Sequence, residues 1–346
     1  MMVAARPYLI FGAAGLLLLL WHISRSDRSQ TTRILTSSPS ETSIVSPTHS
    51  ASNTTLGFQS ILALSAGPSW RTRGLMAAAN LTGLSIYIPP QPPIHPDLVT
   101  VFETIGREDT QIRPTHGASI AWLAHLDIVK YTIQANLDTA LIIEDDVDWD
   151  VSIRSQMIRI AESVRNLTDT NTLEPAPYGR AWDVLWIGHC GEFWEKSIET
   201  VLYKDPTACP HRSYVGWAKT YMYLLPNRHR AVYRSAHPVC SFAYALSRNG
   251  SRKVIRLLGA AQGEAFDVSM MRACEARHLK CISVVPEVMH QYFPDQRFGV
   301  KSMVDIGNGQ QASPKDVEFE HVMGSTENIL ESARCSALWG KRCLKE

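Results

Sequence analysis

The feature that most constrains this chain is a short apolar run that ends in a dense group of acidic residues. Residues 141–143 are Leu-Ile-Ile, a β-prone segment, and four of the next five residues, 144–148, are acidic. Unpaired carboxylates repel one another, so such a group at the end of a strand is expected to hold a divalent cation together with the ligand that this cation carries. A metal-bound phosphate ester is the expected ligand.

The length and net charge of the chain limit the size of its core and the class of its partners. The chain has 346 residues, 45% of them hydrophobic, which is enough to bury one large core or two smaller ones. Its formal net charge of +1 argues against a dedicated nucleic-acid binder. The partners must therefore be inferred from local sites.

The amino terminus reads as a targeting segment over residues 1–23. Residues 8–23 carry no formal charge and are flanked by Arg6 and Arg25. This run is a little shorter than the usual span, so a cleaved signal peptide and a short anchor are both open. No small-x-small cleavage site follows, which favours an uncleaved signal anchor in the membrane. Residues 24–56 are rich in Ser and Thr, contain Pro39 and Pro47, and are expected to form a disordered stem.

Sequons and cysteines favour the lumen of the Golgi or endoplasmic reticulum, with a single membrane pass. Asn-x-Ser/Thr sequons occur at Asn53, Asn80, Asn166 and Asn249. None of the seven cysteines forms a C-x-x-C pair, which leaves disulfides plus one odd thiol, or buried free cysteines. A local bridge between Cys335 and Cys343 is expected, and Cys190 is expected in a disulfide or turn.

From residue 57 to 346, strand and helix patterns alternate, which is typical of one α/β domain. The expected strands are residues 60–64, 84–88, 139–143, 183–187, 240–246 and 281–285. The expected helices are residues 71–80, a helix that starts at Thr115 or His116, and residues 152–166, 248–258 and 267–278. The acids then lie at the carboxyl end of a strand, where open α/β sheets bind ligands.

Three chemistries use acids in this pattern. Asp146, Asp148 and Asp150 imitate an EF-hand loop, but Val151 and Met157 stand where that loop needs Gly and Glu, which excludes it. An apolar strand before an Asp-x-Asp pair also resembles aspartate-nucleophile phosphatases, and this reading stays open. The third is the acid-x-acid motif of nucleotide-sugar glycosyltransferases, in which carboxylates hold Mn²⁺ or Mg²⁺ against a diphosphate leaving group.

Several segments in order resemble glycosyltransferase family 25, the group of lipopolysaccharide and collagen galactosyltransferases, and especially its fungal members. They are RTRGLMAAANLTGL from Arg71, HGASIAWLAHLDIVK from His116, LIIEDDVDWD from Leu141, WDVLWIGHCGE from Trp182, CSFAYALSRNGSRKVI from Cys240, FDVSMMRAC from Phe266 and VVPEVMHQ from Val284. The resemblance spans about residues 58–339. It implies a GT-A-like, Rossmann-type nucleotide-sugar-binding domain and inverting transfer of a hexose, with galactose expected, from a UDP-sugar to a glycan or glycoprotein acceptor.

The resemblance also implies roles for the acids of the strand end. Glu144 and Asp146 form the acid-x-acid pair, with Asp146 as the expected direct metal ligand and Asp148 in support. Asp145 and Arg71 are expected to contribute to the nucleotide site, although a solvated role suits an Arg at a helix start equally well.

Three further residues are assigned on the same basis. Asp267 is the candidate general base that deprotonates the acceptor hydroxyl, and Glu264 is its substitute. An N-cap role would suit Asp267 equally well. His290 is a candidate metal ligand that would complete the metal shell. Trp186, Trp194 and Trp217 could offer a face to a sugar ring, but they are expected to be buried, as is the default for this residue.

The chain departs from the family pattern at two places. Residues 63–65 are Ala-Leu-Ser, followed by Gly-Pro-Ser-Trp at 67–70, where the family has an Asn-bearing strand and a basic turn. Gln291, Tyr292 and Phe293 replace the basic residues that follow the late histidine. An altered nucleotide pocket is therefore expected, and a degenerate transferase that binds without turnover is the first alternative.

Overall fold

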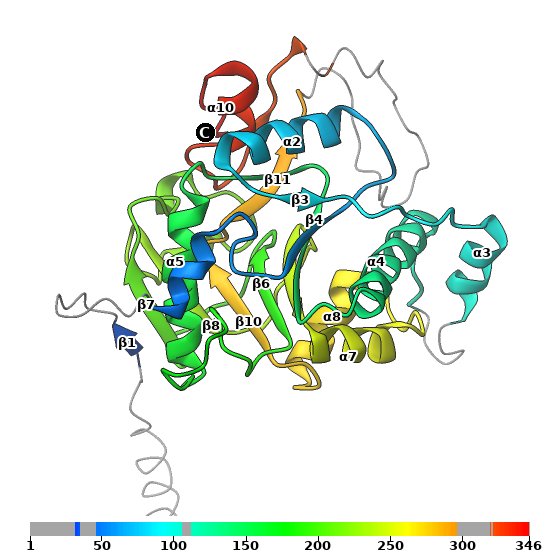
Figure 1. Cartoon of the computed structure of the whole chain (residues 1–346), viewed down its shortest axis with the longest axis horizontal. Coiled ribbons are helices and arrows are strands. Elements are labelled where there is room, and N and C mark those ends of the chain that lie inside the picture. The colour runs from blue at the N-terminus through cyan, green and yellow to red at the C-terminus, as the bar shows by residue number, and fades with distance from the viewer. Residues whose placement is uncertain (1–31, 35–45, 106–111, 296–318, 320, 346) are drawn as a thin grey trace, which may run out of the picture. The chain divides into compact units, whose positions relative to one another are not determined.

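The computed structural model describes residues 32–34, 46–105, 112–295, 319 and 321–345 (Figure 1). These residues form an α/β fold around a mixed central sheet, consistent with a Rossmann-like domain. The expected anchor at residues 1–23 lies outside the described residues. Within the described residues, no helix combines the length and the apolar character needed to cross a bilayer.

The sheet is ordered β1-β7-β8-β10-β6-β9-β4-β2-β3, with β11 joining β6, β5 and β12. Along this path β8 and β9 run against the other strands. The strands are β1 Thr32–Ile34, β2 Ser60–Leu64, β3 Ile86–Tyr87, β4 Thr139–Glu144, β5 Val147–Trp149, β6 Val184–Gly188, β7 Thr200–Lys204, β8 His229–Arg234, β9 Ala243–Ser247, β10 Cys281–Val285, β11 Met289–Phe293 and β12 Ser325–Thr326.

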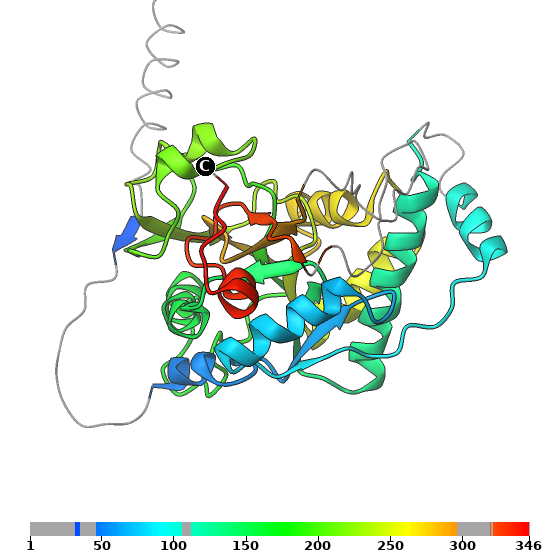
Figure 2. The ribbon, with the colours of Figure 1, turned by 90° about the horizontal axis from the view of Figure 1, so that it is seen from above.

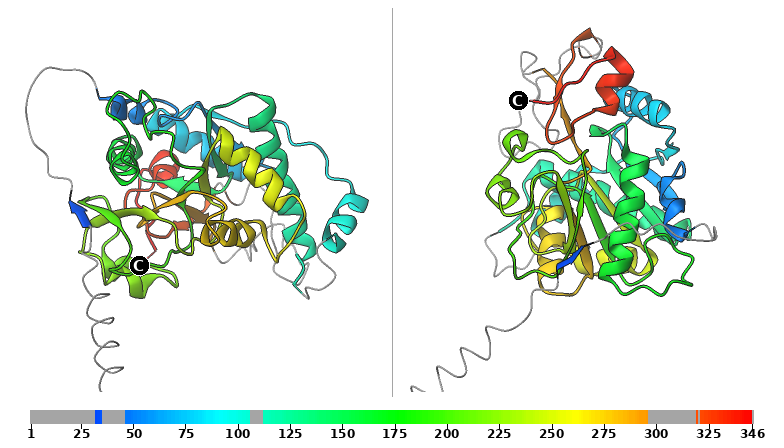
Figure 3. Two further views of the ribbon diagram at one scale, coloured as in Figure 1. Left: turned by 90° about the horizontal axis from the view of Figure 1, so that it is seen from below. Right: turned by 90° about the vertical axis from the view of Figure 1, so that its left-hand side faces the viewer.

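Helices cover both faces of this sheet. They are η1 Pro47–Ser52, α2 Trp70–Thr82, α3 Pro96–Thr104, α4 His116–Gln134, α5 Ile153–Leu167, η2 His211–Ser213, α6 Lys219–Met222, α7 Arg248–Leu258, α8 Phe266–Glu275 and α10 Ala333–Trp339. Helix α10 lies beside α2 (Figures 1 and 2). On the other side α4 and α7 run next to each other, as the left view of Figure 3 shows.

Alternation along the strands divides the interior into two main cores. In β4, Leu141 and Ile143 pack with the α2 and α5 side chains, whereas Ala140 and Ile142 pack with those of α4, α7 and α8. Successive side chains of a strand point to opposite faces, so a run buried on both sides reads as continuously apolar. This explains why the segment before the acids has no polar position.

Each of the expected strands and helices from residue 57 to 285 is confirmed, with ends shifted by a few residues. Helix α4 begins at His116 because the Thr115 side chain accepts a hydrogen bond from the backbone N–H of Ala118. Helix α2 begins at Trp70, where Ser69 and Thr72 form a reciprocal capping box.

The expected stem over residues 24–56 is wrong for its last part. Residues 46–56 are folded: η1 packs on α5, and Ala51 and Leu56 are fully buried. The Tyr178 hydroxyl donates a 2.6 Å hydrogen bond to the Leu56 carbonyl oxygen, and its ring stacks on Phe58. A few well-placed apolar side chains therefore fold a segment whose composition is that of a linker. Strand β1 also falls inside the expected stem and pairs with β7.

Three disulfides join Cys190 to Cys240, Cys274 to Cys281 and Cys335 to Cys343. Cys209 remains a buried thiol. The expected local bridge and the odd thiol are thus confirmed.

Candidate functional site

The acids lie where several strand ends meet. Strands β2, β4, β6 and β10 run in one direction, so their carboxyl ends share one edge of the sheet. Glu144 ends β4, and Asp145 and Asp146 form the tight turn into β5. The pattern at residues 141–146 thus places three carboxylates at the ligand-binding edge of the sheet, as the sequence predicts.

Asp146 is the centre of this acidic cluster, which we define as Glu144, Asp145 and Asp146. Its Oδ2 atom accepts hydrogen bonds from Arg71 Nη1 at 2.7 Å and from Gln291 Nε2 at 3.1 Å. Its Oδ1 atom is buried and has no hydrogen-bond partner within the described residues. A buried carboxylate oxygen without a donor is costly, so this atom is available to a ligand that brings positive charge.

The other two carboxylates are held by hydroxyl groups. Asp145 Oδ2 accepts a 2.6 Å hydrogen bond from Ser65 Oγ, just past β2, and Asp145 Oδ1 lies 3.6 Å from Arg71 Nη1. Glu144 Oε1 accepts a 2.8 Å hydrogen bond from Ser241 Oγ. Glu144 is the most accessible of the three, with 28% of its side chain exposed.

The protonation of these acids reflects burial and crowding. Burial raises the pKa of Asp146 to about 6, and Glu144 and Asp145 add to this increase while Arg71 opposes it. Burial also raises the pKa of Asp145. Burial acts in the same direction on Glu144, but His125, Ser241 and Arg71 outweigh it and lower the Glu144 pKa. The cluster is therefore short of positive charge, and a bound cation would relieve it.

Asp267 contacts the loop that also carries Ser241, the hydrogen-bond partner of Glu144. Its Oδ2 atom accepts a 2.8 Å hydrogen bond from the backbone N–H of Cys240, the residue before Ser241. Asp267 sits in the first turn of α8, but the α8 N-cap position is Ala265, so the N-cap alternative is wrong. The Cys190–Cys240 disulfide ties this loop to the end of β6.

The side chains of Glu264 and His290, the two remaining candidates of this kind, contact residues outside the acidic cluster. Glu264 Oε1 accepts a 2.7 Å hydrogen bond from Arg272. His290 Nε2 lies 3.7 Å from Glu287 Oε1, and its ring packs on Phe242.

Asp148 has a structural role in this arrangement. Its carboxylate accepts hydrogen bonds from Ser332 Oγ, from the backbone N–H of Arg334 at 3.0 Å and from that of Trp149 at 2.8 Å. It therefore holds the start of α10.

Sequence reasoning missed three members of the site, namely Ser241, Gln291 and His125. His125 Nε2 lies 3.2 Å from Ser241 Oγ and 3.6 Å from Glu144 Oε1, and its ring stacks on Phe266. The available signal for His125 was its place on the buried side of α4 beside Trp122 and Val129. Ser241 and Gln291 have no comparable signal, because short polar residues near strand ends are common.

A divalent cation fits the acidic cluster only if a bound ligand supplies part of its coordination. No group of three or more His, Cys, Asp or Glu side chains in the described ranges is arranged to hold a metal ion. Mg²⁺ is often bound by one or two carboxylates plus phosphate oxygens and water. Asp146 Oδ1, which lacks a donor, and the accessible Glu144 suit such a site.

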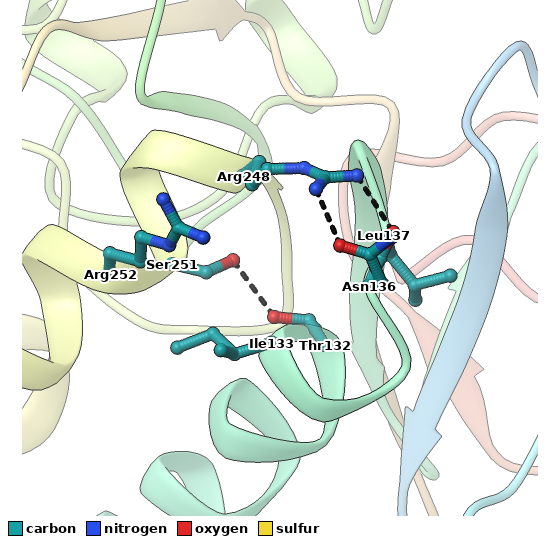
Figure 4. Close-up of a pocket in the computed structure, with 7 residues that line it drawn as sticks. All are labelled: Thr132, Ile133, Asn136, Leu137, Arg248, Ser251 and Arg252. Atoms are coloured by element: carbon teal, nitrogen blue, oxygen red, sulfur yellow. Dashed lines mark hydrogen bonds between the residues drawn. The ribbon is translucent and has the colours of Figure 1, made fainter.

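Two cavities among the described residues lie elsewhere. The one in Figure 4 has a volume of about 10 Å³ and is lined by Asn136, Arg248 and their neighbours. It lies before the start of β4, at the opposite end from the acids, and holds about one water. The other, of about 540 Å³, is lined by Asp150, Arg228, Glu331 and Arg342 among others. Neither includes a member of the acidic cluster.

The fold and the site define an α/β protein with an acidic cluster at the ligand edge of its sheet. No protein-family model matches the chain, and a search of curated proteins also found no match.

Proposed function

We propose that this protein is a glycosyltransferase that binds a UDP-sugar through a shared Mn²⁺ or Mg²⁺ at the acidic cluster and transfers a hexose, with galactose expected, to a glycan or glycoprotein. The observation that carries the proposal is the buried Asp146 Oδ1, which has no donor among the described residues and lies at the carboxyl edge of the sheet. The ordered resemblance to glycosyltransferase family 25 supports the same reaction.

Asp146 and Glu144 would hold the metal, whose chemistry is to neutralise the charge that develops on the departing diphosphate. Ser65 orients Asp145, and Arg71 sits against both aspartates, within reach of a phosphate group placed there. An Arg that neutralises acids in the free protein can turn to phosphate oxygens when a ligand brings its own charge.

Asp267 is the proposed general base. The backbone N–H of Cys240 fixes one carboxylate oxygen, and the other accepts no hydrogen bond from the described part of the chain. That second oxygen can accept the proton of the acceptor hydroxyl as the hydroxyl oxygen attacks the anomeric carbon and the diphosphate leaves from the opposite face. Glu264, the substitute, is likewise held through one oxygen, because Arg272 donates to Oε1, and its Oε2 is buried without a hydrogen-bond partner among the described residues.

A degenerate binding protein is the second candidate. Arg71 and Gln291 donate hydrogen bonds to Asp146 Oδ2 in the free protein. A site that has lost turnover would be expected to keep such hydrogen bonds between its own residues. The two candidate functions differ in one observable: a transferase cleaves the UDP-sugar, whereas a degenerate protein binds it without cleavage.

The test is release of UDP from UDP-galactose by the full-length chain, with Mn²⁺ or with a chelator, and with Asp267→Asn and Asp146→Ala beside it. Transferases cleave their donor slowly with water as the acceptor, so we expect metal-dependent release that both variants reduce at least about tenfold. Donor binding without release would favour the degenerate protein. Phosphate release from simple esters would instead favour an aspartate-nucleophile phosphatase.

A further inference from the structure

Three tryptophans, one in β6 and two after it, differ in exposure. Trp186 and Trp194 are buried, whereas Trp217 is 44% exposed, so the expectation of burial is wrong for Trp217. Trp217 lies between η2 and α6, in the excursion that separates β7 from β8.

The Trp217 indole is held in one orientation. Its ring meets Tyr221 and His237 edge-on, at centroid distances of 5.9 and 6.3 Å. Its Nε1 atom lies against the backbone of Gly191, where a Cβ atom would come within 2.5 Å of it. Gly191 also has φ +142°, so only glycine suits this position. A fixed, half-exposed aromatic ring binds at low entropic cost.

This ring is linked to the proposed catalytic site through a short chain of contacts. Gly191 follows Cys190, whose disulfide partner Cys240 donates its backbone N–H to Asp267. The Trp217 ring therefore lies at the same edge of the sheet as the acids, past the end of β6.

Polar groups border the ring. His237 Nδ1 lies 2.6 Å from Glu275 Oε1, and both side chains are more than two-fifths exposed. Apolar C–H faces pack on aromatic rings, while hydroxyl groups at the edge need donors and acceptors such as these. This combination matches a pyranose ring, which has an apolar face and a rim of hydroxyl groups.

The separation between Glu275 and Asp267 indicates how long the bound glycan must be. Glu275 and Asp267 lie on the same helix, α8, eight residues apart, which corresponds to about 12 Å along its axis. A sugar hydroxyl group held by Glu275 is thus farther from Asp267 than one pyranose ring spans.

We propose that Trp217, with His237 and Glu275 at its rim, is a subsite that stacks a neutral sugar of an extended acceptor glycan, at least one ring away from the reacting hydroxyl. This inference rests on the proposed function for its biological role, but the binding itself does not need the nucleotide site.

The test is saturation-transfer NMR and affinity measurement on the full-length chain with lactose, maltotriose, mannotriose and chitotriose as probes, without nucleotide. At least one probe should bind, Trp217→Ala should weaken it at least about tenfold, and Trp217→Phe should retain part of the affinity. Tyr87→Ala, which removes another half-exposed aromatic ring on β3, is the matched control and should bind normally.

Asp146→Ala separates this claim from the proposed function. It should abolish UDP binding and leave oligosaccharide binding unchanged. The subsite is overturned if no probe binds, or if Trp217→Ala binds as the wild type does. It is also overturned if Trp217→Ala alters only self-association in sedimentation, since the exposed ring would then serve a second copy of the chain.

Discussion

At the residue scale, two acids of one motif have separate roles. Asp146 has one buried oxygen that no donor in the described part of the chain contacts, whereas the Asp148 carboxylate accepts hydrogen bonds from Ser332, Arg334 and Trp149. His290 and Gln291, adjacent on β11, also differ in whether they contact the acidic cluster. Neighbours on a strand point to opposite faces, so Gln291 reaches Asp146 while His290 contacts Glu287. Sequence identifies the motif, but the assignment of each side chain needs the register of β11 against β5.

Glu192 provides a residue-scale prediction about pH. It is buried, and burial raises its pKa from 4.5 to about 8, despite hydrogen bonds from Ser283 and from the backbone N–H groups of His237 and Phe193. Between these two pKa values the native state holds a proton that the unfolded state has lost. The free energy of unfolding should therefore fall as pH rises from about 4.5 to 8, by on the order of a few kcal/mol.

Glu192→Gln should remove this contribution to the slope, because the amide does not titrate. Its Oε1 can accept the two backbone N–H bonds, and its Nε2 can donate to Ser283 Oγ as a protonated carboxyl group would. Urea unfolding at pH 5, 7 and 9 would measure it, with the exposed Glu199→Gln as the matched control. A variant that loses stability with pH as steeply as the wild type would refute a protonated Glu192.

At the element scale, elements with a clear local burial pattern or cap were predictable, whereas a strand that buries a charged residue was not. Strand β10 has the expected bounds because all five of its residues are buried and four of them are apolar, and helix α7 because the Ser247 side chain caps its start. Strand β8 was missed. It contains Arg230, which is buried and pairs with Asp205 at 2.7 Å, so its charge is hidden by a partner 25 residues away. Such pairing has no local sequence signal.

The disulfides give the element-scale prediction. Cys190–Cys240 closes 50 residues and Cys274–Cys281 closes 7. The chain-entropy description gives a stabilisation of about 4 kcal/mol for the first and about 2 kcal/mol for the second. Replacing each pair by serine and measuring urea unfolding should show the larger loss for Cys190 and Cys240. Equal losses would contradict this ranking.

At the scale of the whole molecule, the folded unit begins earlier than its composition indicates. Helix η1 and Leu56 belong to the core that also holds α2 and α5. A chain of residues 57–346 therefore lacks the side chains of η1 and Leu56 that complete this core.

We expect residues 46–346 to be more stable than residues 57–346, because truncation exposes the surface that Ala51 and Leu56 cover. The loss should be a few kcal/mol and should lower Tm by roughly 5–10 °C. Thermal unfolding of the two proteins side by side measures it. Equal Tm values would show that residues 46–56 add no stability.

The most direct test of the central claim is calorimetric titration of the full-length chain with UDP, with Mn²⁺ or with a chelator. Asp146→Ala removes the carboxylate oxygen for which residues 32–34, 46–105, 112–295, 319 and 321–345 supply no donor, and Asp148→Asn is the matched control within the same motif. We expect binding that requires Mn²⁺, is abolished by Asp146→Ala and is retained by Asp148→Asn. Metal-independent binding, or the same affinity in Asp146→Ala as in the wild type, would contradict the claim.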